Sequence, residues 1–105
     1  MSLELRFHDE ALAEIRSAAG WYDEKRPGLG NEFLEALDAR LKQLAGSPNL
    51  GGRFPGADPR SPFRRILLAR FPYVIVFLDA PDAIRVLAVM HGKQRPGYWM
   101  QRLPP

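Results

Sequence analysis

The most restrictive feature of this chain is a set of three strand-length apolar segments in its last third. They cover residues 63–69, 73–78 and 84–90, and short turns at 70–72 and 79–82 separate them. Turns of this length join antiparallel neighbours, because parallel strands need a crossover of a dozen or more residues. The segments therefore predict a three-stranded antiparallel meander over residues 63–91.

The first part of the chain predicts one strand and two helices. Residues 1–8 contain a strictly alternating stretch that is typical of a strand. Asp9 is expected to be the N-cap of a helix that reaches about Glu24, with Glu14 on its solvent-facing side. Helical spacing of apolar residues returns from about Asn31 to Ala45. Because the break between these helices is short, residues 9–46 predict an antiparallel helical hairpin.

The remaining segments complete the predicted organisation. Residues 47–62 are rich in glycine and proline and have no periodicity, so a long loop is expected there. Residues 92–105 are expected to form a C-terminal tail. The order is then β-α-α-β-β-β in a single domain, residues 1–105, of the α+β class. The simplest packing places the helical hairpin on one face of a small, mainly antiparallel sheet and leaves the other face partly open.

Composition excludes several classes of protein. The chain has no cysteine, which excludes disulfides, a thiol nucleophile and thiolate metal ligands, and which fits a reducing cytoplasm. No apolar run has the length that a bilayer requires, and the first residues have no apolar segment typical of a secretory signal. The net charge is +3, and only three of the fifteen basic residues are lysines. Arginine-rich surfaces suit carboxylate or phosphate partners.

Strand alternation predicts where the candidate functional side chains point. The last strand divides into the apolar set Ile84, Val86, Ala88 and Met90 and the mixed set Arg85, Leu87, Val89 and His91. The wholly apolar set is expected to face the helices, which places Arg85 and His91 together on the open face. Whether Arg64 or Arg65 joins them depends on the strand register, which the sequence does not fix.

These residues, with Tyr98 in the tail, have two chemical interpretations. Arginines bind phosphates bidentately, and a histidine can take a proton from a ribose hydroxyl. Alternatively, the arginines form a solvated face or pair with the acidic side chains of a partner. No metal site is expected, because His8 and His91 lie far apart in the chain without ligand spacing. No cofactor is expected either, since the glycines match no phosphate-binding motif.

Short motifs along nearly the whole chain occur in an order and spacing typical of one family. They are Phe7-His8-Asp9-Glu10-Ala11, Trp21-Tyr22, Arg26-Pro27-Gly28-Leu29-Gly30, Phe33-Leu34, Arg64-Arg65, Arg70-Phe71-Pro72-Tyr73, Val86-Leu87-Ala88-Val89 with His91, and Arg95-Pro96-Gly97-Tyr98-Trp99. In these motifs the chain resembles the RelE/ParE superfamily of toxins from type II toxin–antitoxin systems, and within it the ParE-like, plasmid-stabilisation branch. The family fold, a helical hairpin on a small antiparallel sheet, agrees with the fold predicted above.

The resemblance implies one of two activities. RelE-like members cut messenger RNA on the ribosome, and in such a site the catalytic residues here would be Arg65, Arg85, His91 and Tyr98. ParE-like members inhibit DNA gyrase and need no nuclease site. RelE-like sites often add lysines before the second strand, and residues 46–62 contain none. Gyrase inhibition is therefore favoured, with RNA cleavage as its rival and an inactive, antitoxin-binding relic as a third alternative.

The resemblance also implies a partner, a cognate antitoxin. An acidic, partly disordered antitoxin segment is expected to fold over the basic surface. The expected contacts on this chain are Arg64, Arg65, Arg70, Arg85 and the aromatic anchor Trp21. Such a complex would be a toxin–antitoxin hetero-oligomer in the cytoplasm.

Overall fold

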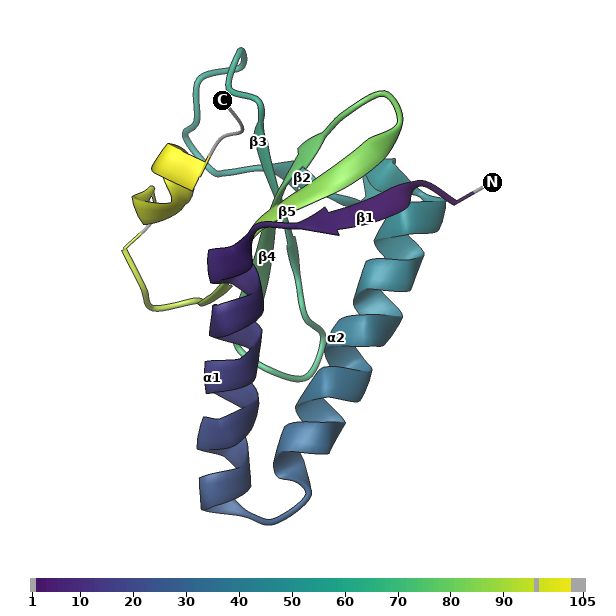
Figure 1. Cartoon of the computed structure of the whole chain (residues 1–105). Coiled ribbons are helices and arrows are strands. Elements are labelled where there is room, and N and C mark those ends of the chain that lie inside the picture. The colour runs from purple at the N-terminus through teal and green to yellow at the C-terminus, as the bar shows by residue number, and fades with distance from the viewer. Residues whose placement is uncertain (1, 96, 103–105) are drawn as a thin grey trace.

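Two long helices pack on one face of a five-stranded sheet (Figure 1). A computed structural model describes residues 2–95 and 97–102 of the chain. The two long helices, α1 (Asp9–Lys25) and α2 (Leu29–Gly46), run antiparallel. Two short 3-10 helices are η1 (Pro48–Leu50) and η2 (Tyr98–Arg102). The strands are β1 (Glu4–Phe7), β2 (Gly52–Arg53), β3 (Phe63–Leu67), β4 (Tyr73–Asp79) and β5 (Ala83–His91). The predicted α+β fold is confirmed.

The sheet has the strand order β1-β5-β4-β3-β2. β3, β4 and β5 form the predicted antiparallel meander, and β1 pairs parallel to β5. The chain between β1 and β5 contains the helical hairpin and the strands β2, β3 and β4, which is ample length for a parallel pair. β2 pairs with β3 through Gly52 and Arg53. The prediction of an irregular loop over residues 47–62 is therefore wrong in part, since that segment contains both η1 and β2. None of the described helices combines the length and apolar composition needed to cross a membrane.

The ends of the helices differ slightly from the predicted ones. The N-cap of α1 is His8 rather than Asp9, because the extended backbone of His8 lets its Nδ1 accept a hydrogen bond from the Glu10 amide at 3.1 Å. The turn into α2 is tight. Gly28 adopts a φ of 90°, and a Cβ on Gly30 would lie 2.5 Å from the carbonyl oxygen of Ala19. These glycines allow the two helices to approach closely at the turn.

The turn between β3 and β4 is longer than predicted. β3 ends at Leu67 rather than Ala69, because the following residues leave the sheet and place Phe71 in the core. The ring of Phe71 lies 5.0 Å from that of Tyr22 and 5.4 Å from that of Phe33. Burial of this aromatic side chain thus decides where the strand stops.

The two faces of the sheet carry separate apolar clusters. The helix-side core joins α1 and α2 to Ile66, Ile75, Phe77 and other residues of the sheet. On the second face, Trp99 is only 2% exposed and packs against Phe54 and Phe63, with ring centroids at 5.1 and 4.6 Å. The expectation of a partly open second face is therefore wrong over the area that η2 and Phe54 cover.

A β-bulge in β5 changes which side chains share a face. Val76 pairs with Ala88, whereas the next residue, Phe77, pairs with Val86, so that Leu87 is an extra residue. An extra residue reverses the alternation that follows it. Ile84 and Val86 face the helices as predicted, but Ala88 and Met90 belong to the second-face cluster. The prediction that Arg85 and His91 share a face is wrong for the same reason.

Candidate functional site

Arg65 of β3 and Arg85 of β5 both point to the second face of the sheet. Arg65 pairs with Val76 and Arg85 with Leu78, and both of these β4 partners belong to the second-face cluster. Arg64 points to the helix side, where its guanidinium donates to the Gly51 carbonyl at 2.8 Å. The register that the sequence left open thus places Arg65 with Arg85.

Arg70 and Trp21, the other predicted partner contacts, lie in different surroundings. Arg70 follows β3 and pairs with Glu32 at 2.6 Å, and Arg26 pairs with the same carboxylate at 2.9 Å. Hydrogen bonds from Arg70 and then Arg26 lower the pKa of Glu32. Trp21 is 51% exposed on α1, with the Lys25 ammonium 4.8 Å from its ring centroid. Trp21 on α1 and Arg70 in the β3–β4 turn therefore lie outside the strands that carry Arg65 and Arg85.

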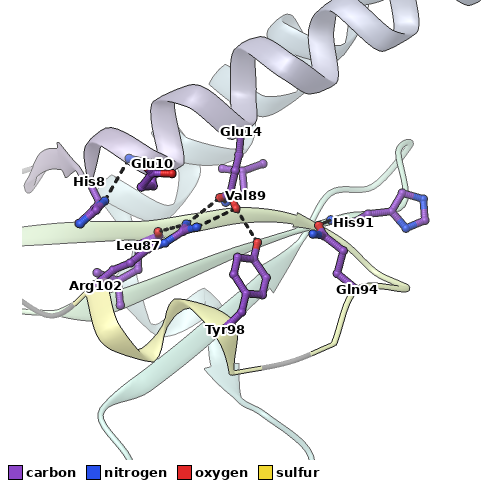
Figure 2. A network of polar contacts seen from close by, with 9 residues as sticks. All are labelled: His8, Glu10, Glu14, Leu87, Val89, His91, Gln94, Tyr98 and Arg102. Carbon is purple, nitrogen blue, oxygen red and sulfur yellow. Dashed lines mark hydrogen bonds and ion pairs between the residues drawn. The ribbon is translucent and has the colours of Figure 1, made fainter.

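Tyr98 is held by a cluster of polar side chains at the edge of the sheet (Figure 2). Its hydroxyl donates to Glu14 Oε2 at 2.6 Å, and the Arg102 guanidinium donates to both oxygens of Glu14, at 3.0 and 3.2 Å. Burial, followed by the hydrogen bond to Glu14, raises the pKa of Tyr98 far above its usual value. The phenol is therefore a neutral donor to Glu14. We call Glu14, Tyr98 and Arg102 the edge clasp.

The edge clasp covers backbone groups that have no strand partner. β1 ends at Phe7, opposite Val86, so the edge of β5 is unpaired beyond that point. There the Leu87 carbonyl accepts from Arg102 at 2.9 Å, and the Val89 amide donates to Glu14 at 3.0 Å. Backbone polar groups near the core need such partners. The clasp therefore satisfies and protects an edge that would otherwise be available for strand pairing.

The sequence does not predict this role for Glu14 and Arg102. Glu14 was expected to face solvent, and the structure contradicts this, since its side chain is only 21% exposed. One signal was present: Glu14 lies between Ala11 and Ala18, which are both buried on the inner face of α1. A carboxylate on that face requires a donor, but the sequence does not reveal that the donor lies 88 residues away at Arg102.

His91 lies apart from the other predicted nuclease residues. Its Nδ1 accepts from the Lys93 amide at 3.1 Å, and its ring packs edge-on against Tyr73 at 5.3 Å. Figure 2 shows the ring pointing away from Tyr98 and the edge clasp. The four residues are thus separated. Arg65 and Arg85 lie on the second face, Tyr98 lies where that face meets the β5 edge, and His91 lies on the helix side. Among the described residues there is no group of three or more side chains suited to hold a metal ion.

Comparison with known proteins identifies the family. Residues 5–96 match the model of the ParE toxin of the type II toxin–antitoxin system parDE. The chain is 29% identical over 100 residues to Toxin ParE2 of Mycobacterium tuberculosis strain CDC 1551 / Oshkosh, and equally to that of strain H37Rv; each alignment covers 91% of this chain and 88% of the relative.

A solved structure shares the fold. It is described as the chromosomal ParDE TA system from P. aeruginosa, and it superposes with a TM-score of 0.71 over 86% of this chain and 96% of the other, at 20% sequence identity. The family model covers most of the chain, from β1 to the segment that follows β5. The chain therefore belongs to the ParE family of toxins of type II toxin–antitoxin systems.

Proposed function

We propose that this ParE-family toxin acts in the cytoplasm by inhibiting DNA gyrase and is neutralised by a cognate antitoxin. The observation that carries the first part is the separation of Arg65, Arg85, His91 and Tyr98. General acid–base catalysis needs the proton-transfer group within hydrogen-bond reach, about 3 Å, of the reacting atom. An imidazole and a pair of arginines on opposite faces of one sheet do not meet that need.

Tyr98 supports the same conclusion. Its hydroxyl donates a hydrogen bond to Glu14, and burial together with that hydrogen bond raises its pKa, so that loss of the phenol proton is harder than in an ordinary tyrosine. Tyr98 is therefore poorly suited to accept a proton from a ribose hydroxyl. An inhibitor of a large enzyme, by contrast, needs a complementary surface rather than a proton-transfer group, and ParE membership favours gyrase as the target.

The proposal of an antitoxin rests on the family and on charge. The structural relative is described as a ParDE toxin–antitoxin system. In this chain, Arg65 and Arg85 form no side-chain hydrogen bond or ion pair with any described residue, and both are partly exposed. Free guanidinium groups on a partly apolar face suit a partner that supplies carboxylates.

The gyrase assignment is tested with the purified chain in two assays. We expect it to slow DNA supercoiling by gyrase, or to trap the complex of gyrase with cleaved DNA, while messenger RNA on ribosomes stays intact. The product of the adjacent gene should restore gyrase activity when added in equimolar amount. Messenger cleavage with normal gyrase activity would move the assignment to the RelE-like alternative, and inactivity in both assays without growth arrest in vivo would favour the relic.

A further inference from the structure

A groove runs from the second face of the sheet to the β3–β4 turn, where Leu68, Phe71 and Tyr73 of the helix-side core also line it. One hollow, of about 440 Å³, lies between residues 54–57 and the start of η2, over Val74 and Met90. Another, of about 470 Å³, lies along β3 and the β3–β4 turn, at residues 67–74. Val74 and Gly92 line both hollows, so that they adjoin. We call the combined depression the second-face groove.

The groove is apolar and carries one free positive charge. Phe54 and Trp99 form part of its wall, and two methionines, Met90 and Met100, add flexible apolar surface. No described lining residue is acidic. Of its two arginines, Arg70 is paired with Glu32, whereas the Arg65 guanidinium lies 5.7 Å from the Phe54 ring centroid without an ion pair to any described residue.

Two exposed apolar side chains mark the groove as a binding surface. Leu67, which lines the turn end, and Met100, which lines the η2 end, are each 51% exposed. Contiguous apolar surface of this kind is uncommon on a protein with no partner. The η2 wall is held by Arg102 of the edge clasp, so much of the groove exists before binding, which reduces the entropic cost of association.

The shape and charge decide the class of occupant. Two adjoining hollows with exposed side chains at both ends suit an extended or helical peptide better than one compact small molecule. Nucleic acid would require several free cations along its backbone and bases stacked on exposed rings, whereas this groove offers one free cation and a buried Trp99. A carboxylate-bearing apolar peptide matches both the floor and Arg65.

We propose that the second-face groove binds a segment of the antitoxin whose apolar side chains fill the two hollows and whose carboxylate pairs with Arg65. This proposal rests on the proposed neutralisation of the chain by an antitoxin. It specifies the contacts more closely, because three of the contacts that the sequence suggested, Arg64, Arg85 and Trp21, do not line the groove.

Two groove variants with matched controls test the proposal. The probe is the purified product of the adjacent gene, and the measurement is its dissociation constant by titration calorimetry. Leu67→Asp and Arg65→Gln should each weaken binding at least about tenfold, as expected for central contacts of an interface. Leu50→Asp, at a leucine that is 53% exposed outside the groove, and Arg16→Gln, at an exposed arginine on α1, should stay within about threefold.

A spectroscopic readout does not depend on these substitutions. The chain has two tryptophans, and Trp21→Phe leaves Trp99 as the only one. Because Trp99 lines the groove, binding should change its fluorescence. An unchanged Trp99 signal, together with near wild-type affinity in both groove variants, would overturn the proposal and leave the antitoxin role intact. If the wild-type chain does not bind the adjacent gene product at all, both proposals fail. If Leu67→Asp lowers the melting temperature, its affinity no longer reports on the groove alone, and the affinity of Arg65→Gln together with the Trp99 fluorescence tests the proposal.

Discussion

His91 is the imidazole that a ribonuclease built on this sheet would need, and it is the residue at which the two alternatives differ most. It lies on the helix side, against Tyr73, whereas Arg65 and Arg85 lie on the second face. We predict that His91→Gln keeps toxicity within a few-fold of wild type in a growth-arrest assay. Only packing and one local hydrogen bond change, which is typically worth about 1 kcal/mol or less.

A catalytic role for His91 would instead give a large loss of toxicity in His91→Gln. General acid–base catalysis is typically worth about 10²- to 10⁴-fold. If His91→Gln lost about a hundredfold of the toxicity while its melting temperature and antitoxin binding were unchanged, His91 would be a catalytic residue and gyrase inhibition the wrong assignment.

At the residue scale, the sequence does not predict which face each side chain of the sheet occupies or which side chains form the edge clasp. The residue types on the sheet could be identified as candidates, but their faces depended on a bulge at Leu87 that no turn residue marks. One extra residue moved His91 away from Arg85. The edge clasp was equally inaccessible, because its partners meet only after α1, β5 and η2 have packed together.

At the scale of the elements, the short segment that joins η1 to β2 depends on a glycine. A Cβ at Gly51 would overlap the ring of Phe77, which is fully buried, whereas a Cβ at the neighbouring Gly52 would meet no atom within 4 Å. We predict that Gly51→Ala lowers the free energy of unfolding by about 1–3 kcal/mol through overpacking. Urea unfolding of the purified variants measures this directly.

Gly52→Ala is the matched control. It should leave stability unchanged or raise it by up to about 1 kcal/mol, because alanine restricts the unfolded chain and Gly52 does not have a positive φ. Equal stabilities of the two variants would mean that Phe77 moves aside and that the segment is not fixed by this contact.

The elements themselves were largely predictable, and the exceptions have physical causes. Periodicity identified both helices and the three strands of the meander, since each has a strong repeat over its length. It missed β2, whose two residues are too few to show alternation. It also predicted β3 to be two residues too long, because the apolar residues after Leu67 are buried in the core without continuing the strand.

For the molecule as a whole, the chemistry of its three tyrosines sets a limit on stability at high pH. Burial raises the pKa of Tyr22, Tyr73 and Tyr98 in the folded chain, and Glu14 adds to the effect at Tyr98. In the unfolded chain each phenol loses its proton near pH 10. Above that pH the unfolded chain holds fewer protons than the folded chain, so the free energy of unfolding must fall as the pH rises.

Tyr98→Phe separates the edge clasp from the other two phenols. At neutral pH the variant should lose about 1–2 kcal/mol of stability, because a hydrogen bond to the partly buried Glu14 carboxylate is removed. Above about pH 10 its stability should fall less steeply than that of the wild type, by up to about 1.4 kcal/mol per pH unit. Tyr73→Phe, which removes a hydroxyl with no hydrogen bond to any described residue, serves as the comparison near neutrality and should cost little there. Urea unfolding between about pH 7 and pH 11 gives both quantities. Parallel alkaline slopes for the wild type and Tyr98→Phe would mean that the folded chain does not retain the Tyr98 proton, and that the edge clasp opens before the protein unfolds.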